Sequence, residues 1–405
     1  MNRNQKFFLI ISSLIILLVG CTGKNEINDL GLVMAVGLDK GEEDGTIQIT
    51  AQIVRPADAR GQTGAPSGQT GEPIWSTTAT GDSIFSAIRN LGRHSSRRIY
   101  WAHNYIIVIN EELAKEGIAD IIDFFTRNHQ LRMRTLVAVT PNPASELVST
   151  VTGIEVVPGQ AIDDIFLYNT ITSAAPKTEM IDLQKAYLSE STQPVLARLS
   201  LNEHGISNKE PSDKPTIKQI ELDGAGVFKD DKLIGTISAD DTMGLMFFIE
   251  NVKSSAVVTN CTDNPNESIT VEIKDEKFEV TPTYDNNQVG FDIQFNTNVQ
   301  LVEAGCPFTL EDKQQIEKLE EQLEETIKGK IEKVLQLAQK EYKVDILELG
   351  NTFNNRYPAE WKEISQNWDS VFAEAKVNTT VDVQITSSAL LYRPTQSGKK
   401  NEGNQ

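Results

Sequence analysis

The chain has 405 residues, of which 38 are basic and 57 acidic, so its formal net charge is −19. Hydrophobic residues make up 39% and charged residues 23%, the usual proportions of a folded globular protein. The length predicts more than one domain, because single hydrophobic cores stop growing at about 250–300 residues. So acidic a chain argues against a nucleic-acid partner, which needs a basic patch, and against attraction to anionic lipid headgroups.

The N-terminus has the layout of a lipoprotein leader. A short basic segment precedes an apolar run from Phe7 to Val19, which spans about 20 Å as a helix, short of the roughly 30 Å core of a bilayer. We therefore predict a cleaved signal peptide at 1–20 rather than a transmembrane helix. Leu18-Val19-Gly20-Cys21 resembles a bacterial lipobox, which predicts acylation of Cys21 after cleavage. An ordinary signal peptide with a cysteine near the cut is the alternative.

Cleavage would leave a mature chain with a lipidated linker at 21–25 and a formal charge of −21, from 36 basic and 57 acidic residues. Its other two cysteines, Cys261 and Cys306, form an even pair outside the cytoplasm, where a disulfide can persist. Spacing alone does not show that their Cα atoms come within about 7 Å. We therefore expect two separate buried thiols, with a disulfide as the alternative.

Alternating strands and helices predict an N-terminal α/β domain at 26–152. Strands are expected at 31–38, 46–54, 73–80, 99–110 and 134–140, and helices at 81–94, 111–127 and 144–151. The first two strands form a hairpin. The segment 55–72, rich in glycine and proline, is expected to be an exposed loop.

A middle domain is expected at 153–251, with helices at 163–172, 178–188 and 239–251, a strand at 195–201, a loop at 208–215 and a hairpin at 220–238. A C-terminal domain follows at 252–394. Its strands at 255–260, 268–274, 277–283 and 289–301 predict an antiparallel sheet.

The C-terminal domain also contains a long helix after Asp312, whose apolar stripe ends at Ala338. We expect this helix to lie across the sheet rather than in a coiled coil. A shorter helix with Trp361 and Trp368 on one face and a closing strand at 377–385 follow, and 395–405 is a polar, disordered tail.

No residues form a recognisable catalytic or metal-binding motif. The four histidines show no H-E-x-x-H spacing, and no nucleotide-binding or nucleophile-elbow motif is present. We expect His103 to be a hydrogen-bonded structural residue rather than a proton carrier. The pairs Asp163-Asp164 and Asp240-Asp241 are typical of helix starts rather than of a glycosidase. We therefore predict no catalytic residue, no cofactor and no metal.

Several segments in order along the mature chain together resemble one family. The first segment is Cys21 with 26–33 and Gly37-Leu38-Asp39, and the second is His103 with 106–109, 112–118, Arg127 and Leu131-Arg132. The third is 224–235, and the last is Asp345-Ile346-Leu347 through Arg356, Pro358, Trp361 and Trp368. This set is similar to the Ger(x)C family, the lipoprotein C subunits of nutrient germinant receptors in spore-forming bacteria. Thr22-Gly23 stands where the family often has Trp-Asp.

The resemblance implies an α+β fold of three α/β-type domains, with mixed or antiparallel sheets packed by helices. It also implies a protein held by acylated Cys21 on the outer leaflet of the spore inner membrane, with two membrane subunits, A and B, as partners. The complex would sense a small-molecule germinant, and the chain would not be an enzyme.

Two other functions stay open as alternatives. A solute-binding lipoprotein of a transporter is the runner-up, although such proteins carry two lobes of parallel βα units and the C-terminal half here predicts antiparallel strands. An anchored cell-wall hydrolase is a distant third, because its metal or nucleophile motif is missing.

Overall fold

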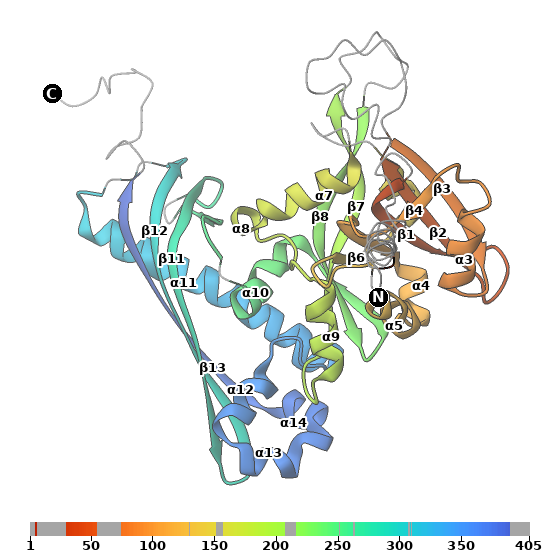
Figure 1. Cartoon of the computed structure of the whole chain (residues 1–405). Coiled ribbons are helices and arrows are strands. Elements are labelled where there is room, and N and C mark those ends of the chain that lie inside the picture. The colour runs from red at the N-terminus through yellow and green to blue at the C-terminus, as the bar shows by residue number, and fades with distance from the viewer. Residues whose placement is uncertain are drawn as a thin grey trace.

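The computed structural model describes residues 5, 30–54, 74–128, 130–150, 157–206, 216–250, 252–261, 264–306, 308 and 310–388. Within them, two β-sheets occupy opposite halves of the view in Figure 1, with helices on and between them. The expected mixed α/β class is therefore confirmed. The predicted signal peptide, Cys21, the loops at 55–72 and 208–215 and the tail at 395–405 lie outside the described residues.

The first sheet contains nine of the described strands, in the order β3-β2-β1-β5-β6-β7-β8-β9, with β4 paired to β1. Their bounds are β1 Leu30–Lys40, β2 Ile47–Val54, β3 Ile74–Gly81, β4 Arg98–Tyr100, β5 Ile106–Asn110, β6 Leu136–Thr140, β7 Val195–Ile206, β8 Thr216–Lys229 and β9 Lys232–Ile237. The central pairs from β1 through β5 and β6 to β7 are parallel, and the outer pairs are antiparallel.

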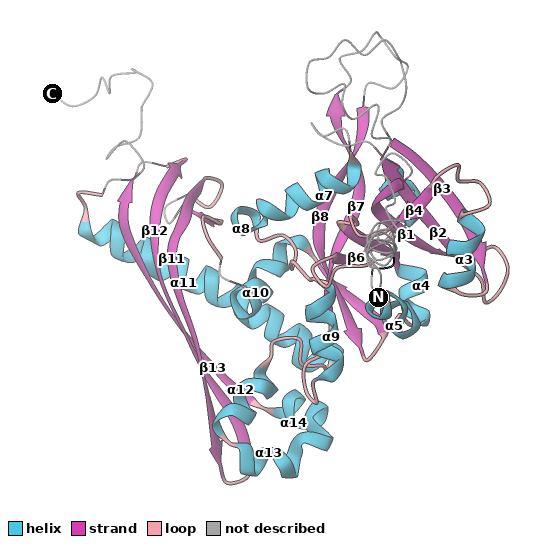
Figure 2. Ribbon diagram, viewed as in Figure 1, coloured by secondary structure: helices cyan, strands magenta, loops and turns pink. Residues whose placement is uncertain are grey.

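Helices cover both faces of this sheet (Figure 2). One face carries α3 Ile84–Leu91, α4 Glu111–Glu116, α5 Ala119–Arg127 and α9 Met180–Leu188, and the other carries α6 Ala144–Ser149 and α7 Pro158–Leu167, followed by α8 Asn169–Thr172. Burial on both faces explains the unbroken apolar run in β5. Ile107 and Ile109 pack on the first face, and Ile106 and Val108 pack on the second.

The first sheet continues across the domain boundary expected between residues 152 and 153. Strand β6 pairs with β7 through Ala138 and Ala197, so elements from both sides of that boundary belong to one sheet. The connecting residues 151–156 lie outside the described ranges.

The second sheet has the order β10-β11-β12-β13. Its bounds are β10 Ala256–Asn260, β11 Ser268–Asp285, β12 Gln288–Ala304 and β13 Lys376–Ser388. Strand β11 is continuous through a register shift between Ile273 and Asp275, where two separate strands were predicted. The last strand, β13, runs parallel to β12, so the sheet is mixed rather than antiparallel. The helices between the two strands provide the crossover that a parallel pair needs.

The long helix α11 spans Lys313–Gln336 and lies across the second sheet, as predicted. Asp312 caps it by accepting hydrogen bonds from the backbone N–H groups of Gln314 and Gln315. The stripe that faces the sheet and α10 (Ala239–Ile249) is buried, and consists of Leu319, Leu323, Ile327, Ile331 and Val334. A π-helical turn, Leu337–Tyr342, continues α11.

Four predicted elements are interrupted in the structure, one of which is the helix at 163–172, divided into α7 and α8 at Tyr168. The strand at 99–110 divides into β4 and β5, because a turn closes from the Asn104 N–H to the Trp101 carbonyl. The helix at 111–127 divides into α4 and α5 at Gly117, whose φ of +132° a helix cannot contain. The helix with Trp361 and Trp368 divides into α13 Pro358–Ile364 and α14 Trp368–Glu374, after α12 Leu349–Arg356.

Candidate functional site: a polar pocket between the two sheets

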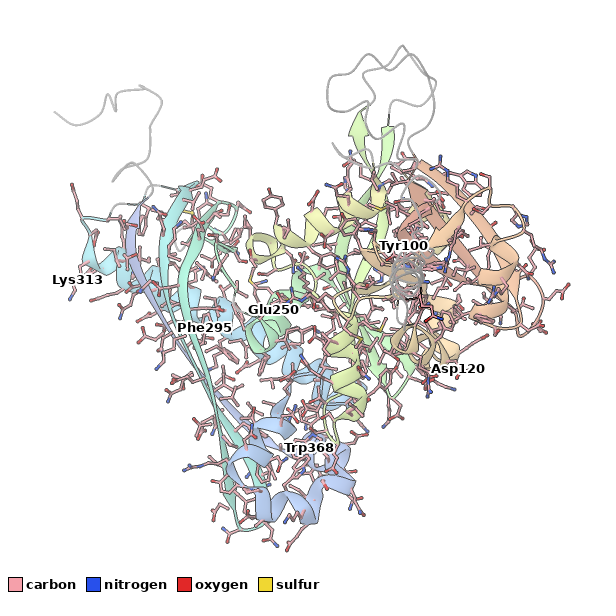
Figure 3. The ribbon with its side chains drawn as sticks, in the orientation of Figure 1. Tyr100, Asp120, Glu250, Phe295, Lys313 and Trp368 are labelled. Carbon is pink, nitrogen blue, oxygen red and sulfur yellow. A yellow bond between two sulfur atoms is a disulfide. The ribbon has the colours of Figure 1, made fainter. Side chains whose placement is uncertain are left out.

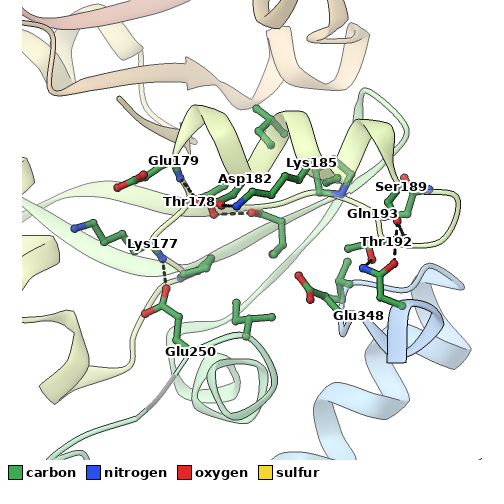
Figure 4. Close-up of a pocket in the computed structure, with 18 residues that line it drawn as sticks. Lys177, Thr178, Glu179, Asp182, Lys185, Ser189, Thr192, Gln193, Glu250 and Glu348 are labelled. Carbon is green, nitrogen blue, oxygen red and sulfur yellow. Dashed lines mark hydrogen bonds and ion pairs between the residues drawn. The ribbon is translucent and has the colours of Figure 1, made fainter. Parts of the chain in front are cut away.

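A pocket of about 560 Å³ lies where α9 and the loop before β7 meet the end of α10 and the segment 346–351 (Figure 4). It therefore joins elements of the first sheet to elements that pack on the second. Two short segments, Pro176–Glu179 and Thr192–Val195, form much of the wall on the side of the first sheet.

Charged side chains of both signs line the pocket, with carboxylates in excess. The carboxylates belong to Glu179, Asp182, Glu250 and Glu348, and the amines to Lys177 and Lys185. Lys185 Nζ donates to Asp182 Oδ1 at 2.8 Å, which neutralises that carboxylate. The remaining charge favours a bound amine or guanidinium over an anion.

Glu250, labelled in Figures 3 and 4, is one of the part-buried carboxylates of the pocket. Its Oε1 atom accepts a hydrogen bond from the Lys177 backbone N–H at 2.8 Å. Burial raises the pKa of Glu250 above its ordinary value, although the Lys177 hydrogen bond and positive charge act in the opposite direction. This side chain therefore ties the end of α10 to the segment that leads into α9.

The opposite end of the pocket is closed by polar contacts around Asn351. Its amide Nδ2 donates to Thr192 Oγ1 at 3.0 Å, and Ser191 Oγ donates to Asn351 Oδ1 at 3.3 Å. One residue further along, the Gln193 backbone N–H donates to the Asp345 carbonyl at 2.8 Å. These contacts connect the loop before β7 to the start of α12.

Asp345 holds the pocket wall 346–351 in place from behind. Its fully buried carboxylate accepts four hydrogen bonds, from the backbone N–H groups of Leu347, Leu349 and Gly350 and from Trp368 Nε1. Burial raises the pKa of Asp345 to about 6, and these donors oppose the rise. Asp345 belongs to one of the segments that resemble the family, but the sequence does not predict its role, because its donors become neighbours only in the fold.

Polar groups of several kinds line the pocket and can bind a charged or hydrogen-bonding ligand. Among the described residues that line it there are carboxylates, amines, amides and hydroxyls, but no histidine and no cysteine.

Two other aspartates of the resembling segments also cap backbone groups. Asp39 accepts from the N–H groups of Ala144 and Ser145, at 2.7 and 2.8 Å, and so caps α6. Asp231 accepts from Ala119 through its carboxylate, at 3.4 Å, next to the break at Gly117. These residues join elements that are distant in sequence, which is a structural role.

The structure joins Cys261 and Cys306 in a disulfide, with their Cα atoms 6.3 Å apart, and not as the two separate thiols expected. The sequence could not show this proximity, which depends on β10 and β12 flanking β11. With Glu267, the two cysteines also make the one group of metal-ligating side chains found among the described residues. Because the two sulfur atoms are bonded to each other, they are not thiolate ligands here. Cys21 lies outside the described residues.

Two expectations for polar residues need correction. His103 is exposed, its ring lies 6.1 Å from that of Tyr100, and it has no hydrogen-bond partner among the described residues, so it is not a hydrogen-bonded core histidine. Asp163 lies inside α7 rather than at its start. By contrast, Asp240 and Asp241 occupy the first turn of α10, as expected for a helix start.

Two protein-family models match the chain. The spore germination protein N-terminal domain matches residues 23–201, and the spore germination B3/GerAC-like C-terminal domain matches residues 223–389. The chain is 23% identical over 400 residues to spore germination protein KC of Bacillus subtilis (strain 168), covering 96% of this chain and 97% of that protein. It is 23% identical over 390 residues to spore germination protein B3 of the same strain, covering 93% and 96%.

A solved structure shares the fold. The crystal structure of the GerBC protein matches with a TM-score of 0.53 at 20% sequence identity, and covers 86% of this chain and 97% of that chain.

Proposed function

The chain belongs to the Ger(x)C family of spore germination proteins, and on that premise we propose that it is the lipid-anchored subunit of a nutrient germinant receptor. The family consists of germination proteins and is not an enzyme family. The observation that carries the proposal is the match of both family domains, in order, over almost the whole mature chain.

In this proposal the acyl group on Cys21 confines the protein to the outer leaflet of the spore inner membrane. Among the described residues, no helix is both long and apolar enough to cross a bilayer. Acyl chains contribute about 0.8 kcal/mol per buried methylene, and two or more chains make a lasting anchor. Confinement to the membrane plane raises the effective concentration of the chain near its partners.

The proposed partners are the two membrane subunits, A and B, and the chain acts on them by contact. Binding of a nutrient by the complex would shift the balance between two arrangements of its subunits. The polar pocket supports a role in binding, since its lining is rich in charged and hydrogen-bonding side chains.

A Cys21→Ala variant tests the anchor. We expect the variant chain to leave the spore membrane fraction and nutrient-triggered germination to fall to the level of a strain without the gene. A Cys261→Ala/Cys306→Ala control removes two cysteines but keeps the lipobox, so it should stay in the membrane fraction. Full germination with a wholly soluble Cys21→Ala chain would remove the anchor from the mechanism.

A further inference from the structure

The arginines of this acidic chain are concentrated in one stretch of its sequence. Seven of the thirteen arginines lie between residues 89 and 134, and the stretch from Ser83 to Asn110 has four arginines and no aspartate or glutamate. In contrast, residues 252–388 contain 13 basic and 25 acidic residues, a net charge of −12. Residues 21–251 as a whole carry 20 basic and 31 acidic residues, a net charge of −11, so the arginines form a local cluster within a chain that is acidic in both halves.

Five of these arginines line one groove of about 900 Å³ between α3, β4 and α5. They are Arg89, Arg93, Arg97, Arg98 and Arg127. Asp123 is the one carboxylate among the described lining residues, and it accepts two hydrogen bonds from Arg127 Nε, at 2.7 and 2.8 Å. The other four guanidinium groups have no ion pair with a described residue. The groove, called here the arginine groove, therefore carries four uncompensated positive charges.

An exposed aromatic side chain accompanies the charges. Phe85 in α3 is 55% exposed, although it is large and apolar. The Arg89 guanidinium lies 4.9 Å from the centroid of its ring, and the Phe124 ring of α5 lies 6.4 Å away. Aromatic rings and arginines together are typical of a surface at the level of lipid headgroups, where the ring reaches the acyl boundary and the guanidinium binds phosphate.

The chain enters the fold beside this groove. Leu30, the first residue of β1, is paired with Arg98 in the parallel ladder between β1 and β4. A Cβ at Gly31 would lie 3.9 Å from the Arg97 Cβ. Nine peptide units separate Cys21 from Leu30, which span at most about 30 Å. An acyl anchor on Cys21 therefore keeps the arginine groove close to the bilayer.

We propose that the arginine groove binds the anionic phospholipid headgroups of the membrane and orients the anchored protein, with this groove toward the bilayer. Charge complementarity and the position of Leu30 favour a lipid surface over an acidic protein. Each basic residue near an anionic surface strengthens binding, and the acidic surfaces elsewhere on the chain are repelled from the same surface. This inference rests on the proposed acylation of Cys21.

The rate at which each arginine side chain is chemically modified measures its contact with the membrane. The full acylated protein is placed on vesicles of phosphatidylcholine alone or of phosphatidylcholine with phosphatidylglycerol, and phenylglyoxal modification of each arginine is measured by mass spectrometry. We expect modification of Arg89, Arg93, Arg97 and Arg98 to slow about 5- to 10-fold on the anionic vesicles, and the difference to disappear in about 0.5 M salt. Exposed Arg356 in α12 is the internal control, and its rate should not change.

Two variants with equal charge changes sharpen the test. In Arg93→Gln/Arg97→Gln/Arg98→Gln, protection of the remaining Arg89 should be lost. In the control Lys313→Gln/Lys318→Gln/Lys333→Gln, which changes α11, protection should persist.

The possible outcomes distinguish a failure of the proposed acylation from a failure of the proposed lipid binding by the arginine groove. Protein that fails to stay on neutral vesicles contradicts the proposed acylation, whereas protein that stays on both vesicles with equal modification of the groove overturns the inference. Equal protection on neutral vesicles with about 10 mM inorganic phosphate would assign the groove to free phosphate, and protection only when a membrane subunit is added would assign it to an acidic protein. Either result would also overturn the inference.

Discussion

The carboxylate of Asp345 accepts a hydrogen bond from Trp368 Nε1 at 3.0 Å, in the interior between α12 and α14. The same carboxylate accepts three backbone hydrogen bonds at the start of α12. One side chain thus fixes a wall of the polar pocket and the indole around which Trp361, Phe353 and Phe372 pack.

Replacing Asp345 with alanine should destabilise the protein by about 3–5 kcal/mol, because it leaves three backbone N–H groups and one indole N–H without an acceptor in a buried place. Urea denaturation of the full chain measures the change. The control is Asp369→Ala, which removes an exposed ion pair with Lys229 and should cost less than about 1 kcal/mol. Equal effects of the two substitutions would show that Asp345 is not a structural centre.

Glu276 should make the protein less stable as the pH rises. Its Oε1 accepts a hydrogen bond from the Val252 N–H at 2.6 Å, its Oε2 has no hydrogen-bond partner in the described part of the chain, and burial raises its pKa to about 7. Because the pKa is higher in the folded than in the unfolded chain, the contribution of Glu276 is fully present below pH 4.5 and is lost as the pH rises to about 7.

In Glu276→Gln, the free energy of unfolding should lose the part of its pH dependence that Glu276 causes. For this half-buried group that part is on the order of 1 kcal/mol. The measurement is the urea midpoint at several pH values between 4.5 and 8. Asp345, whose pKa is raised to about 6, contributes a slope of the same sign and should persist in the variant. An unchanged slope in Glu276→Gln would contradict the assignment.

Two glycines should respond to alanine in opposite directions. Gly224 has a φ of +91°, and a Cβ there would lie 2.0 Å from the carbonyl oxygen of Ile237, so Gly224→Ala should destabilise the protein by about 2 kcal/mol or more. Gly329 lies inside α11 with nothing within 4 Å of a Cβ, so Gly329→Ala should stabilise it by about 0.5–1 kcal/mol. Thermal unfolding of both variants is the check, and destabilisation by Gly329→Ala would contradict the packing described for α11.

The disulfide of Cys261 and Cys306 should stabilise the protein by about 2–4 kcal/mol, since it closes a loop across 45 residues of sequence and restricts the unfolded chain. Cys261→Ser/Cys306→Ser should lower the urea midpoint accordingly. Alkylation of the unreduced, denatured protein from spores, followed by mass spectrometry, checks the bond itself. Alkylation of both cysteines without a reductant would show that they are free thiols.

Helices and strands with a regular pattern of apolar residues were predicted correctly from the sequence. The stripe from Leu319 to Val334 lies on one face of α11, and the alternation in the long strands has the expected buried side. The points at which a predicted element is interrupted were not predicted, because a single glycine or turn leaves the periodicity on both sides unchanged. Gly117 divides one predicted helix, and a turn at Trp101 divides one predicted strand.

The functional surfaces depend on residues that only the fold brings together. Asp345 and Trp368 are 23 positions apart, and Arg127 reaches the groove of Arg89 and Arg98 from a different helix. Total charge predicted no affinity for anionic lipid, because the acidic residues in both halves of the chain outnumber the arginines of one groove. Composition carries no information about such a local cluster.

The central proposal, that the chain acts beside membrane subunits of a receptor, is tested most directly by affinity purification from detergent-extracted spore membranes. A tag on the polar C-terminal tail should recover the A and B subunits in about equal amounts with the wild-type chain, and much less of either with Cys21→Ala. Recovery of an acylated, folded chain with neither membrane subunit would contradict the account.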